Sequence, residues 1–126
     1  MIVDGDHERV CRWVLDRAGG DYRHGMVGIG QLKCGELIAG VCYEWYQGDS
    51  ILIHIRCDSP PSRRFLWFIF YYPFDQIKVS TLYATIAEDN VSAIDFAVRC
   101  GASILFPVSG RLVFALTKDK AIFLKR

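Results

Sequence analysis

Two side chains that can move protons lie in apolar surroundings near the middle of the chain. Glu44 belongs to the segment 37–47 and His54 to the segment 50–56, and both segments have the residue pattern of strands. A carboxylate or an imidazole in such a place can serve as a general base. The ordinary alternatives are a solvent-side strand residue for Glu44 and a satisfied polar side chain on the sheet for His54.

A pair of arginines opens a strongly apolar segment that reads as a helix. Ser62 is a suitable N-cap, Arg63 and Arg64 follow it, and the strand 50–56 ends shortly before. A helix N-terminus carries unpaired N–H groups and a partial positive charge, so a strand that gives way to a helix is a natural phosphate site. The alternative is that both arginines coat a solvent-facing first turn.

The remaining elements follow from hydrophobic spacing and from turn residues. Asp6 caps a helix over 7–18, and three strands follow at about 26–32, 37–47 and 50–56. The helix that starts after Ser62 is kinked or ended by Pro73. Then come a strand at 78–87, a helix that Asp89 or Asn90 caps and that ends at Cys100, and strands at 104–106 and 112–117. This order predicts an α/β (α+β) fold, with a mixed central sheet of about six strands, helices on both faces and one parallel βαβ crossover.

Composition narrows the class of protein. A length of 126 residues predicts a single domain over 1–126, and a net charge of +1 argues against a dominant nucleic-acid footprint. No apolar run is long enough for a membrane helix, and the acidic N-terminus lacks the features of a signal peptide, so we expect a cytoplasmic protein. The five cysteines fit neither a zinc site nor a disulfide framework, and no metal is expected. The basic tail 118–126 reads as a solvated end.

Several motifs resemble the GNAT (Gcn5-related N-acetyltransferase) superfamily, which acetylates amines with acetyl-coenzyme A. The segment 90–96, Asn-Val-Ser-Ala-Ile-Asp-Phe, followed by Gly101, is similar to the family's late N-x-x-A-x-x-[YF]…G signature. The segment 37–41 resembles the family's second strand. Arg63-Arg64-Phe65 and Tyr72-Pro73-Phe74 resemble a group of short GNAT-like proteins often encoded by bacteriophages, which would place the chain in a host cytoplasm.

The resemblance implies an acetyl-CoA site and assigns residues to it. The pantetheine arm would lie along the end of the strand 50–56 like an added strand, and the backbone groups of Ile55, Arg56 and Cys57 would contact it. The pyrophosphate would lie at the start of the helix, and Asn90 would hydrogen-bond the pantetheine unless it is a plain helix cap. The implied cofactor-binding set is Ile55, Arg56, Cys57, Ser62, Arg63, Arg64, Phe65, Asn90 and Phe96. The candidates for the catalytic base are Glu44 and His54.

The chain also departs from the family pattern. The family's pyrophosphate loop, [QR]-x-x-G-x-[GA], corresponds here to residues 60–65, which contain no glycine. Phe96 stands where members often have a tyrosine that acts as a general acid, and phenylalanine cannot donate a proton. Ala102 follows Gly101 where the family usually has phenylalanine.

Three functions stay open on the sequence. The first is an acetyl-CoA-dependent N-acetyltransferase acting on an unidentified amine. The second is a catalytically inactive GNAT-fold module that binds a protein partner through an aromatic face, with Tyr43, Trp45, Tyr46 and Trp67 as candidates for that face or for an acceptor pocket. The third and weakest is nucleic-acid binding through the arginine pair and the basic tail. A homodimer through an exposed final strand or an aromatic face is compatible with the first two.

Overall fold

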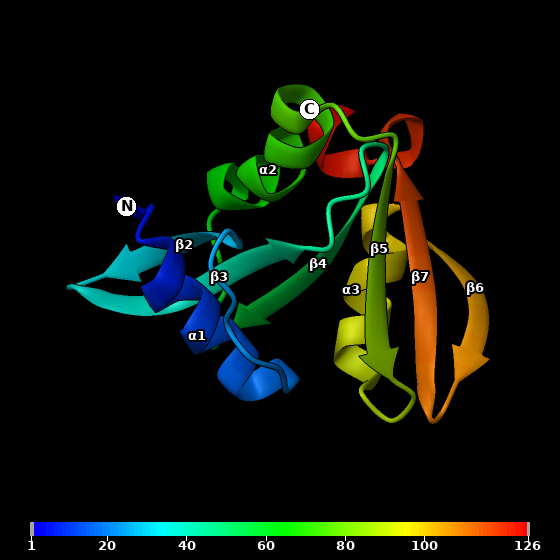
Figure 1. Cartoon of the computed structure of the whole chain (residues 1–126), viewed down its shortest axis with the longest axis horizontal. Helices are drawn as coiled ribbons and strands as arrows, with labels where there is room; N and C mark the ends of the chain where they lie inside the picture. The colour runs from blue at the N-terminus through cyan, green and yellow to red at the C-terminus, as the bar shows by residue number, and fades with distance from the viewer. Residues whose placement is uncertain (1, 126) are drawn as a thin grey trace. The chain divides into compact units, whose positions relative to one another are not determined.

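The computed structural model describes residues 2–125, which form one mixed sheet and three α-helices (Figure 1). The seven strands have the order β1-β2-β3-β4-β5-β7-β6. Their bounds are β1 Ile2–Asp4, β2 Val27–Lys33, β3 Glu36–Glu44, β4 Ser50–Cys57, β5 Thr81–Ala87, β6 Ser103–Val108 and β7 Arg111–Thr117. The α-helices are α1 His7–Ala18, α2 Arg63–Tyr71 and α3 Val91–Cys100, and α2 continues into a π-helical segment, Tyr72–Ile77.

The chain divides into two compact units. The first holds the residues up to Trp45 together with Ile53–Ile69, and the second holds Tyr46–Leu52 together with the residues from Phe70 onward. The strand β4 and the helix α2 therefore contribute residues to both units.

In the first unit, α1 packs on one face of β2 and β3. Asp6 caps the helix by accepting a hydrogen bond from the N–H of Arg9, and Gly19 ends it at a φ of +80°. Glycines on the strands allow a close approach, since a Cβ at Gly40 would lie 3.0 Å from the Val14 side chain. The core beneath the helix is made of Val10, Cys11, Val14, Leu15, Met26 and Cys42.

The helix α2 covers the opposite face of the same strands. Tyr43, whose side chain alternates with that of Cys42 along β3, is buried and donates a hydrogen bond of 2.5 Å from its hydroxyl to the carbonyl oxygen of Ile69. Phe65 and Ile69 are fully buried beside it. The predicted helices on both faces are thus present in this unit.

The second unit contains the parallel strand pairing of the predicted crossover. Ser50, Ile51 and Leu52 of β4 pair with Thr81, Leu82 and Tyr83 of β5, and both β5–β7 and β6–β7 are antiparallel. Asn90 rather than Asp89 caps α3, and Gly101 ends it. We also predict from the sequence that β4 and β5 diverge near Cys57, and that point stays a prediction because Ile53–Cys57 belong to the first unit.

Four sequence predictions about the elements need correction. The short strand β1 has no counterpart among the predicted strands. The strand β3 ends at Glu44 and not at Gln47, because Trp45 adopts a left-handed φ of +57°, which a strand cannot continue through. Similarly, Lys78 has a φ of +66°, and β5 begins at Thr81. The tail is not wholly solvated, since Ala121 is buried and Phe123 stacks on Phe70.

Proline and bulge positions decide two local features. The α-helix that starts at Arg63 ends at Tyr71, and Pro73 lies in the π-helical turn that follows, as expected for a residue without an N–H. In the β2–β3 ladder, Gln31 pairs with Ala39 and Leu32 with Leu37, so Ile38 has no partner and forms a bulge. The bulge breaks the predicted alternation, and Leu37 packs on the α1 side.

We expect Gly101 to be the least replaceable glycine of the second unit. A Cβ at this position would lie 1.9 Å from the carbonyl oxygen of Lys120, and φ is +106°. Gly110 is the matched control, because its φ is +81° but a Cβ there would meet nothing within 4 Å. Gly110→Ala should lower the free energy of unfolding by about 1 kcal/mol, and Gly101→Ala by about 3 kcal/mol or more. Urea denaturation measures both, and equal losses would contradict the steric argument.

Candidate active site

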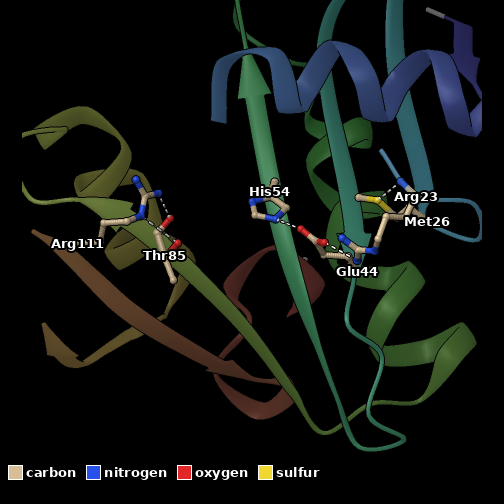
Figure 2. Close-up of polar contacts among 6 residues, drawn as sticks. All are labelled: Arg23, Met26, Glu44, His54, Thr85 and Arg111. Atoms are coloured by element: carbon tan, nitrogen blue, oxygen red, sulfur yellow. Dashed lines mark hydrogen bonds and ion pairs between the residues drawn. The ribbon is translucent and has the colours of Figure 1, made fainter. Parts of the chain in front are cut away.

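The centre of the candidate site is Glu44, whose carboxylate lies between a cation and an imidazole (Figure 2). Its Oε1 accepts a hydrogen bond of 2.7 Å from Nη2 of Arg23, and its Oε2 contacts Nε2 of His54. The side chains of Glu44 and His54 are only 9% and 15% exposed. The structure thus brings together the two candidates for the base that the sequence suggests, and Glu44 is not a solvent-side residue.

The contact with Glu44 assigns the two ring nitrogens of His54. A carboxylate only accepts hydrogen bonds, so Nε2 of a neutral His54 carries the proton. The lone pair then lies on Nδ1, which becomes the nitrogen able to accept a proton. A base that is oriented by a third group is the usual arrangement of an activated proton acceptor.

Arg23 was not found by sequence reasoning, although it completes this group. It comes from the loop before β2, and the pairing of Val27 with Tyr43 brings that loop to the end of β3. The guanidinium of Arg23 lies 4.1 Å from the centroid of the Trp45 ring. The backbone N–H of Arg23 donates to Sδ of Met26 at 3.1 Å (Figure 2). The only sequence signal is a basic residue in a loop that a hairpin returns to a buried carboxylate.

The nearest thiol cannot act as the nucleophile of this site. Cys42 lies two residues before Glu44 and is fully buried with Cys11. Its hydrogen bond with Cys11, its burial and the charge of Glu44 all raise the pKa of Cys42, so the thiol stays protonated at neutral pH. All five cysteines are free, and Cys11, Cys42 and Cys100 are buried.

The end of β4 holds a second charged group. The guanidinium of Arg56 donates two hydrogen bonds to the carboxylate of Asp58, at 3.0 and 2.8 Å, and one of 2.8 Å to the carbonyl oxygen of Trp13. It also stacks on the Trp13 ring. The hydrogen bonds from Arg56 lower the pKa of Asp58. The Arg56 side chain is therefore fully engaged, and only backbone groups of Ile55, Arg56 and Cys57 stay candidates for ligand binding.

The N-terminus of α2 offers fewer donors than the sequence suggests. Ser62 is the N-cap as predicted, because its Oγ accepts a hydrogen bond from the N–H of Phe65, and its own N–H donates to Oε1 of Gln31 at 2.9 Å. Phe65 is fully buried, so neither its side chain nor its N–H is available to a ligand. Arg63 and Arg64 are exposed, and within residues 2–125 neither guanidinium has a hydrogen-bond or ion-pair partner.

The two candidates on α3 have structural partners. Asn90 Oδ1 accepts from the N–H of Ala93 and from the hydroxyl of Ser92, which is the plain cap that the sequence left as the alternative. Phe96 stacks on Phe123 with ring centroids 6.5 Å apart. Among the aromatic candidates, Tyr43 is a core residue, and Trp45 and Tyr46 are exposed. Trp67 is half-buried.

Two further classes of feature are missing from the described residues. Between residues 2 and 125 there is no group of three His, Cys, Asp or Glu side chains that could hold a metal ion. In the same range, no helix has the length and apolar character needed to cross a lipid bilayer.

No protein-family model matches the sequence, and no curated protein matches it significantly, but solved structures do. The N-acetyltransferase PseH of Campylobacter jejuni, solved with acetyl coenzyme A, aligns with a TM-score of 0.66 and 16% identity over 90% of this chain and 80% of that one. The spermidine/spermine N-acetyltransferase SpeG of Vibrio cholerae, solved with manganese ions, aligns with a TM-score of 0.69 and 13% identity. The alignment covers 94% of this chain and 93% of that one. Apo FdhC, a nucleotide-linked sugar GNAT, aligns with a TM-score of 0.68 and 10% identity over 94% of this chain and 86% of that one. The chain therefore has the GNAT fold, and identities this low establish the fold alone.

Proposed function

We propose that this protein is an acetyl-CoA-dependent N-acetyltransferase that acts on an amine, as a single GNAT-like domain. The observation that carries the proposal is the chain of contacts from Arg23 through Glu44 to His54, on a fold shared with N-acetyltransferases. The complex of PseH with acetyl coenzyme A supports the choice of acyl donor. The acceptor is an amine in our proposal because SpeG is a spermidine/spermine N-acetyltransferase.

Bound acetyl-CoA would supply an activated acetyl thioester, and the protein would supply the binding groups. At the first turn of α2, the N–H of Ser62 donates to Gln31 and the N–H of Phe65 donates to Ser62 Oγ. The N–H groups of Arg63 and Arg64 therefore remain as the donors for a ligand. The guanidinium groups of Arg63 and Arg64, unpaired within residues 2–125, add positive charge to that turn, so they can replace the backbone contacts that a glycine loop would give. The residues therefore fit a pyrophosphate, with arginine side chains as the main donors. Backbone groups of Ile55, Arg56 and Cys57 are our proposed contacts for the pantetheine arm.

The proposed base is Nδ1 of His54. A protonated amine must lose a proton before it can attack, and a neutral imidazole accepts one near neutral pH. Glu44 holds the ring in the required tautomer, and its negative charge would stabilise the imidazolium that forms. Arg23 holds the other carboxylate oxygen, so it fixes the orientation of Glu44.

Two observations favour an inactive binding module as a second candidate. Phe96 has no proton to donate and is stacked on Phe123. The strand β6, at the end of the strand order, is exposed along its whole length, with Ile104, Phe106 and Val108 each about half exposed. An uncharged edge strand is a ready template for pairing with another chain. In this reading a protein partner or a second copy of the chain would pair with β6.

We place the protein in the cytoplasm, in the host's if its origin is viral. The support is that all five cysteines are free, as is usual in reducing compartments. The resemblance to short phage-encoded proteins stays a prediction from the sequence.

Binding of acetyl-CoA, measured by isothermal titration, separates the two candidates. We expect saturable binding by the wild type and a Kd at least about tenfold weaker for the double variant Arg63→Ala/Arg64→Ala, because charge-assisted hydrogen bonds to the phosphates are lost. The control Arg12→Ala/Lys120→Ala removes two exposed positive charges elsewhere and should leave the Kd unchanged. If the wild type shows no heat of binding at millimolar acetyl-CoA, the proposal that it is an acetyltransferase is wrong.

The role of His54 is tested by acetylation of an amine panel that contains polyamines, amino sugars and lysine peptides. His54→Gln should lower kcat/KM by about 100-fold or more while the Kd for acetyl-CoA stays the same, because the base is lost and the binding groups are kept. His24→Gln replaces an exposed loop histidine and serves as the control. Unchanged kcat/KM in His54→Gln would show that another group takes the proton.

Pairing along β6 is tested by light scattering of the purified protein. If a second copy pairs with this strand, the wild type is a dimer, and Phe106→Lys, which puts a charge on the exposed edge, is a monomer. The control Val91→Lys changes an exposed apolar residue on α3 and should stay dimeric. A monomeric wild type, or a dimer that Phe106→Lys leaves intact, would contradict the proposed pairing.

A further inference from the structure

The segment between β4 and α2 carries no glycine, but it is fastened to the neighbouring strands at both of its ends. This connecting loop, residues 58–62, contains Pro60 and Pro61. At its start, the N–H groups of Asp58 and Ser59 both donate to the carbonyl oxygen of Ile38, at 2.8 and 3.3 Å. Ile38 is the bulge residue of β3, which has no partner in β2.

The other end of the loop is held by Gln31. The residue is 7% exposed, and it is the one polar or charged residue among the buried side chains of the described chain. Its Oε1 accepts the hydrogen bond of 2.9 Å from the N–H of Ser62. Gln31 pairs with Ala39, directly beside the bulge at Ile38, so one irregularity of the β2–β3 ladder holds both ends of the loop.

This arrangement determines which groups the first turn of α2 presents. Ser62 is fixed through its N–H by Gln31, and its Oγ caps the N–H of Phe65. The N–H groups between these two, of Arg63 and Arg64, then begin the helix with no acceptor among the described residues. Without Gln31, the Ser62 N–H would lose its acceptor on β2 in a half-buried place, and the turn would lose the support that fixes its start.

We propose that Gln31 is a positioning residue for the anion site at the N-terminus of α2. In a glycine-rich loop, the glycines themselves would let the backbone adopt the required conformation. Here Gln31, on the strand β2, holds the loop in that conformation instead. The inference rests on the proposed function for the identity of the anion, the pyrophosphate of acetyl-CoA. In this proposal Gln31 acts on the ligand through Ser62, whose N–H it holds, and not by binding the anion itself.

The test compares Gln31→Met, which keeps the size of the side chain but removes the acceptor, with Ile29→Ala on the same strand. Both variants should lose stability, but only Gln31→Met should lose hydrogen-exchange protection at the Ser62 amide. Only Gln31→Met should bind coenzyme A about tenfold more weakly, which corresponds to about 1.4 kcal/mol. Gln31→Asn, whose side chain is one methylene shorter, gives the same readouts if Gln31→Met does not fold.

The outcomes separate this inference from the proposed function. If the wild type does not bind coenzyme A, the proposed function fails, and the exchange of the Ser62 amide still decides whether Gln31 fixes the turn. If the wild type binds, an unchanged Kd in Gln31→Met overturns the positioning role. Protection of the Ser62 amide that survives the loss of the acceptor overturns it as well, as would an equal loss of affinity in Ile29→Ala.

Discussion

The hydrogen bonds that tie the loop 58–62 to β2 and β3 set the start of α2, and the candidate site depends on that start. Ser62 is held by Gln31, and the beginning of the loop is held by the carbonyl of Ile38. A loop with two prolines and no glycine is stiff, so it needs an external support at only a few points. The bulge in β3 supplies this support where the ladder would otherwise be regular. The helix can then begin at Arg63 with two arginines in its first turn, where an anion is favoured.

The same strand positions Glu44, the centre of the proposed proton-transfer group. The left-handed turn at Trp45 ends β3 immediately after Glu44 and lets the Trp45 ring meet the guanidinium of Arg23. A largely buried carboxylate needs a partner of opposite charge, and Arg23 provides one while His54 takes the other oxygen. Charge pairing and the end of β3 at Glu44 together explain this arrangement, which fixes the ring of His54, the residue that we propose as the base. Phe96 marks the limit of the likeness to acetyltransferases, since no hydroxyl is present there.

Much of the fold could be predicted from the sequence, because periodicity and caps are local signals. Asp6, Ser62 and Asn90 cap helices where their types and positions predict it, and Pro73 ends the α-helical part of its helix. Glu44 and His54 are each proposed from the sequence as a base among apolar neighbours on a central strand, but their contact was not predicted. The features that could not be predicted depend on contacts between residues far apart in the sequence. Arg23 contacts Glu44 across 21 residues, and Gln31 contacts Ser62 across 31. No pattern marks a bulge at Ile38 or a left-handed turn at Trp45, because tertiary packing selects both.

The most direct test of the proposed anion site is a crystal structure of the protein grown with coenzyme A. We expect pyrophosphate density within hydrogen-bond distance of the Arg63 and Arg64 N–H groups, with their side chains folded over it and the Gln31–Ser62 bond intact. Phosphates bound elsewhere on the chain, with the first turn of α2 left facing solvent, would contradict it.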